Sequence, residues 1–391
     1  MSHDAPLPPI VCLAGIEWAG LWQRSQTLTS GFAQRGARVA FIEQLDAGRS
    51  VQVRDWRRVL ARGRNLLRRR YRWDRGVHVL TPATVPLRFA APLNRRLLSR
   101  LARRLQDLGF QRPIVWHYPY GGPNSTRLEQ LLSPRLLVYD CVSRVRGYPY
   151  ATPEVIAAEE ALARRADLVL TDARILWEEK RAVNPRCVQV PPGVDFELFA
   201  PCDTWEEPAP LRDLRHPRLG FFGGINERLD QATLLDFAAH HPEWTVILIG
   251  PVLTDVSAFR SAPNVRLLPQ VAHAALGGWL QALDVITIPY HATEFTRGII
   301  PAKLFEALAT GKPVVAMGLP ELDAYEHVIH LCRPDGFGAA VTAALATDSP
   351  TGRERRLALA RENSWTSRID QVWGLLQTAI EEQGRADRGS A

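Results

Sequence analysis

Two charged residues, Lys303 and Glu306, stand three positions apart at the start of a short predicted helix. Residues with this spacing share one face of a helix. A lysine in the first turn adds a full positive charge to the N–H groups that are free there, which suits a phosphate. A carboxylate one turn later can accept both hydroxyls of a ribose. The pair therefore predicts one element that binds the phosphate and the pentose of a nucleotide.

An ordinary Lys–Glu pair on a solvent-exposed helix face is the alternative. The lysine count argues against it, because the chain has only three lysines, Lys180, Lys303 and Lys312, beside a large excess of arginine. Two of the three fall in the same short segment. We therefore expect this segment to be functional.

The segment around the pair predicts a loop, a helix and a buried strand in turn. Pro301 suits the first helical position, where an N–H would have no partner in any case. Gly311 suits the left-handed backbone at a helix end, and residues 313–317 follow as a core strand. The apolar face of the helix consists of Leu304, Phe305, Leu308 and Ala309.

Length and composition indicate a globular chain of two domains. The 391 residues exceed one ordinary core, and 46% are hydrophobic and 23% charged. Five scattered cysteines without metal spacing fit reduced thiols in a cytoplasmic protein. The net charge of +7 implies an anionic partner. We expect domains over residues 1–200 and 201–365, and a C-terminal helix with a disordered tail over 366–391.

Polar residues follow three buried strands of the first domain, whose strand–helix rhythm predicts a doubly wound parallel sheet. Glu17, His117 and Asp140 stand at or just after the carboxyl ends of these strands, where such sheets bind ligands. Each is a candidate general base. The alternative is a polar side chain that satisfies loop amides.

A densely basic stretch, Arg54–Arg75, carries interleaved aromatic and aliphatic residues. A cationic amphipathic helix of this kind can lie on an anionic membrane surface. A solvated face is the alternative, and it is favoured for a second basic stretch over residues 94–108. Charge without a recognition motif gives no ground for a nucleic-acid partner.

Several motifs in this order resemble the GT-B glycosyltransferases, most closely the family 4-like proteins of bacterial cell-surface polysaccharide clusters, including the teichuronic-acid type. The resemblance covers most of the chain. It rests on Leu21–Gln26, Val138–Cys141, Ala166–Thr171, Pro192–Asp195, Phe222–Gly224, Pro301–Glu306 and Gly311–Val315.

The resemblance implies two Rossmann-like domains that face a cleft, with the C-terminal helix returning to the first. It implies a UDP- or GDP-linked sugar donor on the second domain and a saccharide or lipid-linked acceptor on the first. Glu306 matches the glutamate that holds the ribose. Diphosphate-binding positions match Gly223, Gly224, Arg228 and Lys303, and backbone N–H groups would come from Gly298, Ile299 and Ile300. Such enzymes need no metal or other cofactor when lysine, arginine and helix dipoles neutralise the leaving group.

One departure bears on stereochemistry. Many retaining members have a glutamate eight residues before the second one, and here Gly298 stands at that place. The sequence therefore favours an inverting transferase, which needs a base from the first domain. The alternatives are a sugar-nucleotide isomerase of the 2-epimerase type on the same fold, and a non-catalytic basic protein that binds membranes or polyanions. For the transferase we expect a cytoplasmic protein that is peripheral on the inner membrane.

Overall fold

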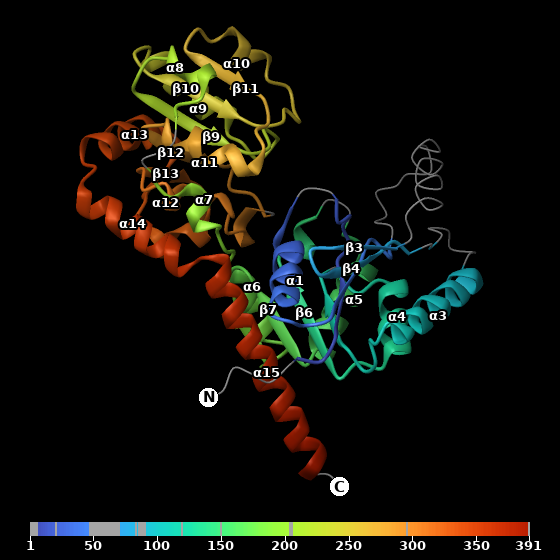
Figure 1. Ribbon diagram of the computed structural model, residues 1–391. Coiled ribbons are helices and arrows are strands. Elements are labelled where there is room, and N and C mark those ends of the chain that lie inside the picture. The colour runs from blue at the N-terminus through green and yellow to red at the C-terminus, as the bar shows by residue number, and fades with distance from the viewer. Residues whose placement is uncertain are drawn as a thin grey trace. The chain divides into compact units, whose positions relative to one another are not determined.

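The computed structural model describes residues 7–19, 22–46, 71–82, 84, 91–118, 120–148, 151–202, 206–294 and 296–389 (Figure 1). Two compact units divide the chain: the first comprises Met1–Val190 and Arg368–Ala391, and the second comprises Pro191–Ser367. Residues 191–200 were predicted to belong to the first domain. They belong to the second unit because helix α7 (Phe196–Phe199) packs on α11 (His273–Gln281) and α12 (Lys303–Ala309).

The first unit is built on a sheet with eight strands among the described residues, in the order β3-β4-β2-β1-β5-β6-β7-β8. All neighbours are parallel except β3 and β4, which form an antiparallel pair. The strands are β1 (Ile10–Leu13), β2 (Val39–Ile42), β3 (Tyr71–Asp74), β4 (Val77–Leu80), β5 (Ile114–His117), β6 (Leu136–Cys141), β7 (Leu168–Thr171) and β8 (Cys187–Gln189).

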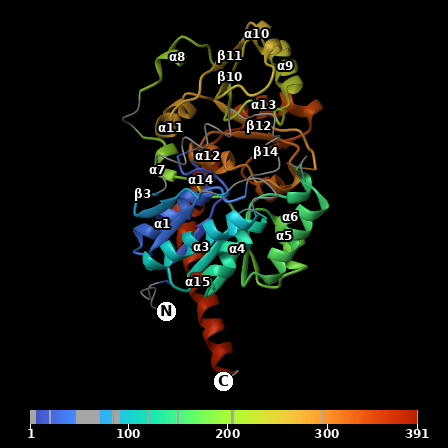
Figure 2. The same cartoon turned by 90° about the vertical axis from the view of Figure 1, so that its right-hand side faces the viewer.

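Helices connect these strands, and α3 packs beside α4 (Figures 1 and 2). Thr152 caps α5 as its sequence predicts, because its side chain accepts a hydrogen bond from the Val155 N–H. The described helices of this unit before its C-terminal segment are α1 (Arg24–Gln34), α3 (Ala91–Asp107), α4 (Pro123–Leu132), η2 (Val145–Gly147), α5 (Pro153–Arg165) and α6 (Arg174–Arg181).

Of the two basic stretches, the structure describes residues 94–108 in full but only the end of Arg54–Arg75. The part of Arg54–Arg75 before Tyr71 lies outside the described residues. Its end, expected to be helical, forms β3 instead, where Arg72 pairs with Glu43. Helix α3 is amphipathic as expected: Leu98, Ala102 and Leu105 are buried. Its arginines are exposed.

The second unit is built on a fully parallel sheet with six strands among the described residues, in the order β11-β10-β9-β12-β13-β14. Apolar runs form these strands. A parallel sheet is covered on both of its faces, and the residues of β9, β10, β12 and β13 are buried. They are β9 (Arg218–Phe222), β10 (Thr245–Ile249), β11 (Val265–Leu268), β12 (Val285–Pro289), β13 (Val314–Met317) and β14 (His330–Cys332).

Asp230 caps α9 as predicted, since its carboxylate accepts from the Thr233 N–H at 3.0 Å. The remaining elements of this unit are α8 (Ala209–Arg212), α9 (Gln231–His240), α10 (Ser257–Ser261), η3 (Thr296–Gly298), η4 (Pro320–Tyr325), η5 (Pro334–Gly336), α13 (Phe337–Ala346) and α14 (Pro350–Glu362).

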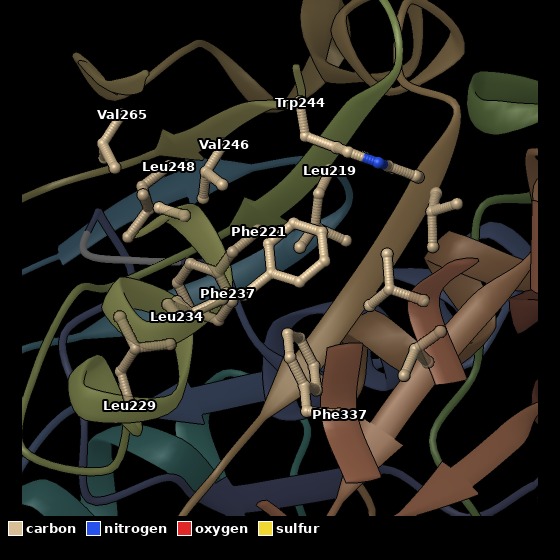
Figure 3. Packing of buried hydrophobic residues seen from close by; sticks show 14 of the residues in the cluster. Leu219, Phe221, Leu229, Leu234, Phe237, Trp244, Val246, Leu248, Val265 and Phe337 are labelled. Carbon is tan, nitrogen blue, oxygen red and sulfur yellow. The ribbon is translucent and has the colours of Figure 1, made fainter. Parts of the chain in front are cut away.

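A large apolar core fixes the sheet of the second unit. Phe221 and Leu219 of β9 point toward Phe237 of α9, and Phe337 of α13 closes the cluster (Figure 3). The rings of Phe237 and Phe337 meet edge to face at 5.8 Å. This packing holds the carboxyl end of β9, where the predicted phosphate turn begins.

The last helix, α15 (Trp365–Gly389), continues into the segment that was expected to be a disordered tail, which is helical up to Gly389. From Arg368 onward it belongs to the first unit, as predicted. Ile369 packs closely on α1: a Cβ at Gly31 would lie 2.3 Å from the Ile369 Cδ1, so a larger residue there would require the Ile369 side chain to move. Asp370 also pairs with Arg35 of α1.

A close backbone contact supports the start of the Gly223 turn. Gly250 follows β10 with φ +149°, and a Cβ there would lie 2.1 Å from the Gly223 carbonyl oxygen. We predict that Gly250→Ala destabilises the chain by about 1–3 kcal/mol, because both the strained backbone and the clash oppose a side chain. Thermal unfolding measures the effect.

Gly278→Ala is the matched control, since a Cβ at this position of α11 meets nothing within 4 Å. It should leave the melting temperature unchanged or raise it slightly, because alanine favours helix. Equal melting temperatures for the two variants would contradict the proposed contact.

Candidate functional sites in the two units

In the second unit the structure brings Lys303 over the turn that follows β9. Gly223 has φ +111°, and a Cβ there would lie 2.9 Å from the Lys303 Nζ. A side chain at this position would displace the ammonium or be displaced by it. The two positions matched to a diphosphate site are therefore neighbours in space, 80 residues apart in sequence, and half-buried Gly224 follows directly.

Aromatic rings fix the ammonium of Lys303. Its Nζ donates a hydrogen bond to the Tyr290 hydroxyl at 2.5 Å and lies 4.2 Å from the centroid of the Phe221 ring. Cation–π attraction of this kind holds a charge in place without cancelling it. Among the described residues no carboxylate forms an ion pair with Lys303, so its positive charge remains available to a ligand.

Glu306 lies on the next turn of α12 and does not pair with Lys303. Its Oε1 is 3.3 Å from the Nε2 of His273, the first residue of α11. The Glu306 side chain is 20% exposed, whereas that of His273 is 58% exposed. The hydrogen bond with Glu306 raises the pKa of His273 above its ordinary value. The surface Lys–Glu pair is therefore not what this segment forms.

The backbone around α12 differs from the prediction. The helix begins at Lys303, two positions after Pro301, and has seven residues. Gly311 ends it with φ +73°, as predicted. A helix this short has a weak dipole, so the Lys303 ammonium supplies most of the positive charge.

The other residues matched to donor-binding positions are Gly298, Ile299, Ile300 and Arg228. Gly298 ends the buried turn η3, and the Ile299 N–H already donates to the Thr296 carbonyl at 3.2 Å, which removes it as a phosphate ligand in this state. Ile300 is 4% exposed. Arg228 follows the Gly223 turn with an exposed side chain.

In the first unit, two of the three candidate bases are completely buried. His117 and Asp140 lie within the last residues of β5 and β6, not beyond them. The His117 Nε2 is 2.9 Å from Glu129, which Arg165 also binds. Asp140 accepts a hydrogen bond from the Arg24 Nε at 3.0 Å. Glu17 is exposed in the loop after β1.

A pocket of about 320 Å³ opens beside this Arg24–Asp140 pair, between the carboxyl ends of β1, β5 and β6. The strand order reverses between β1 and β5, and open α/β sheets bind ligands at such a point. None of the three candidate bases lines the pocket; four tyrosines and Arg24 do. Sequence analysis missed the tyrosines, although Tyr118 and Tyr120 directly follow β5. The tyrosines are Tyr118, Tyr120, Tyr139 and Tyr148.

Among the described residues, no three or more His, Cys, Asp or Glu side chains lie close enough together to form a metal site. No helix in this part of the chain has both the length and the apolar character to cross a bilayer.

Comparison with known sequences finds a similarity to one protein family in the second unit. Residues 216–347 match the model of the glycosyl transferases group 1, and this range contains Gly223, Lys303 and Glu306. TuaH of Bacillus subtilis (strain 168), named as a teichuronic acid biosynthesis glycosyltransferase, is 29% identical over 67% of this chain and 71% of its own length. A D-inositol 3-phosphate glycosyltransferase of Geodermatophilus obscurus is 29% identical over 61% of this chain and 58% of its own.

Solved structures share the fold over nearly the whole chain. Sucrose-phosphate synthase from Thermosynechococcus elongatus aligns with a TM-score of 0.68 at 16% identity, covering 96% of this chain and 100% of its own. HepE from Anabaena, solved in complex with UDP and glucose, aligns with a TM-score of 0.66 at 16% identity, covering 95% and 100%.

The comparisons favour the transferase over the isomerase and the binding protein. Residues 216–347 match a glycosyltransferase family, solved structures share the fold over nearly the whole chain, and a glycosyltransferase aligns with two thirds of the sequence. The chain is a glycosyltransferase with two Rossmann-like domains of the GT-B fold.

Proposed function

We propose that this glycosyltransferase takes its sugar from a UDP- or GDP-linked donor bound to the second unit. One observation carries the proposal: the ammonium of Lys303 is fixed over the Gly223 turn, and no carboxylate among the described residues neutralises it. In this proposal Lys303 binds the diphosphate, and Glu306 accepts the two ribose hydroxyls. The complex of HepE with UDP and glucose agrees with such a donor.

The departing nucleoside diphosphate gains negative charge as the glycosidic bond to the donor breaks. Lys303 is placed to stabilise that charge, with Arg228 as a second cation beside the turn. We propose that these side chains serve in place of a metal ion. A fixed positive charge acts most strongly where water is excluded, and the rings of Phe221 and Tyr290 shield this one.

We propose an inverting reaction in which the acceptor binds the first unit and Glu17 removes the proton from its hydroxyl. Of the three candidate bases, only Glu17 is exposed; Asp140 is paired with Arg24 and His117 faces Glu129. Gly15 and Ile16, which precede Glu17, line the pocket of the first unit that Arg24 and the four tyrosines also line. The name of TuaH supports an acceptor that belongs to a cell-surface polysaccharide.

The donor site is tested by nucleotide binding. We predict that UDP or GDP raises the melting temperature of the protein in the presence of EDTA, and that Glu306→Ala weakens this binding at least tenfold, because two charge-assisted hydrogen bonds to ribose are lost. Glu294→Ala is the matched control, since Glu294 is an exposed carboxylate paired with Arg297. Calorimetric titration gives both affinities.

Stabilisation by neither nucleotide would overturn the donor assignment. An equal loss of affinity in the Glu294 variant would remove the special role given to Glu306. A requirement for a divalent cation would contradict the metal-independent proposal while leaving the donor site intact.

The contact between His273 and Glu306 predicts a pH dependence of stability. Because the pKa of His273 is raised on folding, its contribution is complete below pH 6.5, its ordinary pKa, and disappears as the pH rises above the folded value. The pair is half exposed, so this contribution is at most about 1 kcal/mol. His273→Gln should therefore lower the melting temperature at pH 5.5 and leave it unchanged at pH 8.5.

His240→Gln serves as the control, since His240 lies on an exposed face of α9 beside Asp236. Melting curves recorded across this pH range compare the two variants. A His273 variant whose melting temperature falls equally at both pH values would exclude the charge contact with Glu306.

We propose that the basic stretch Arg54–Arg75 contacts an anionic membrane surface, where a lipid-linked acceptor would be found. Replacing Arg68, Arg69 and Arg70 by glutamine should weaken binding to phosphatidylglycerol vesicles by about 1 kcal/mol per arginine. The same change at Arg95, Arg96 and Arg100 of α3 removes equal charge and should have a smaller effect. Equal losses in co-sedimentation would indicate a response to net charge alone.

A further inference from the structure

The pocket of the first unit combines a buried cation with a wall of aromatic rings. Arg24 enters it from the start of α1, and its side chain is only 10% exposed. It is the single charged residue among the described residues that line the pocket. Its charge and the tyrosines therefore decide what the pocket accepts.

Carboxylates behind the pocket cancel the charge of Arg24. Its Nε donates to Asp140, which is fully buried, and its Nη1 donates to the Val190 carbonyl at 2.9 Å. Burial alone would lower the pKa of Arg24, but the charges of Asp140 and Asp172 more than reverse this effect and raise it. The ion pair with Asp140 therefore compensates the positive charge of Arg24, so little of it remains to attract an anion. Its guanidinium can still act as a hydrogen-bond donor.

Hydrogen-bonded side chains hold one tyrosine of the pocket wall rigidly. The Tyr139 hydroxyl donates to Glu159 at 2.9 Å, and Lys180 pairs with the same carboxylate oxygen at 2.5 Å. Lys180 and Glu159 are both buried, so this arrangement costs energy to break. The ring of Tyr139 is therefore a fixed surface.

A second tyrosine of the pocket wall has its hydroxyl close to the Arg24–Asp140 pair. Burial and the negative charge of Asp140, together with a hydrogen bond to its carboxylate, raise the pKa of Tyr118, so the hydroxyl stays protonated. Tyr118 therefore contributes its ring to the wall of the pocket.

We infer that this pocket binds an uncharged sugar ring, which deepens the proposed function by naming the class of acceptor group that the first unit recognises. A pyranose has apolar C–H faces that suit tyrosine rings, and hydroxyl edges that suit Arg24 and Ser143. The volume lies near the lower end of the range for small-molecule sites, about 300–1,000 Å³, which fits a ligand of one or two rings. A phosphorylated or carboxylated sugar would meet a guanidinium whose charge is already balanced.

The test compares ligands that differ only in charge. Neutral methyl hexosides, the corresponding methyl hexuronides and hexose 6-phosphates are titrated into the full chain, and binding is read by saturation-transfer NMR. We expect the neutral hexosides to bind at least tenfold more tightly than either anion, and the preference to persist from low to high salt. Tighter binding of the anions would overturn the inference. A result in which none of the three classes binds would also overturn it.

Variants place the sugar in this pocket. Ser143→Phe fills the space and should weaken hexoside binding at least tenfold, while Gln130→Phe adds the same ring on the exposed face of α4 and should not. If Ser143→Phe does not fold, Tyr148→Ala removes part of the wall instead and should have the same effect. Hexoside binding that survives in the folded variants would contradict the location.

Nucleotide binding, which the second unit supplies, separates the two proposals. If the chain binds hexosides but no nucleoside diphosphate, the inference about the pocket stands and the proposed donor site is contradicted. If the chain binds a nucleotide but prefers anionic sugars, the proposed donor site stands and the inference about the pocket is contradicted.

Discussion

The fixed position of one ammonium group over one glycine turn is the interaction on which the donor site depends. Lys303 can reach that position only because β9 and β12 are neighbours in a parallel sheet, so that Gly223 and Tyr290 follow strands that end at the same edge. The buried cluster around Phe221 and Phe237 holds β9 in register. A change that moved either strand would separate the charge from its turn.

The charges of Lys303 in the second unit and Arg24 in the first unit are compensated to different degrees. Lys303 is held by a phenol and aromatic rings, which leave its charge uncompensated among the described residues, whereas Arg24 is paired with Asp140. An uncompensated charge suits a diphosphate leaving group, and a compensated one suits the hydroxyls of a neutral sugar. The distribution of charge is therefore the basis on which we propose different ligands for the two units.

Local signals in the sequence predict most of the fold. Apolar runs indicate the buried strands of both sheets but not β3, and Thr152 and Asp230 cap α5 and α9 because capping depends on a few neighbouring residues. The start of α12 was predicted too early, because Pro301 is compatible with the first helical turn without requiring it. The domain boundary was predicted too late, because it depends on where α7 packs and not on composition.

Lys303, Glu306 and Gly223 were identified from spacing and family resemblance, but their partners were not. Tyr290 and His273 come from other elements, and only the sheet register brings them to α12. Of the pocket tyrosines in the first unit, Tyr118 and Tyr120 follow β5, Tyr139 lies within β6 and Tyr148 follows η2, so no single sequence spacing relates all four. Sequence periodicity reports neighbours along one element; contacts between elements require the tertiary structure.

A crystal structure of the chain with UDP tests the central claim most directly. The account predicts the Lys303 Nζ within hydrogen-bond distance of a diphosphate oxygen, and the Glu306 carboxylate on the two ribose hydroxyls. UDP bound elsewhere, or bound with Lys303 still directed only at Tyr290 and Glu306 directed only at His273, would contradict it.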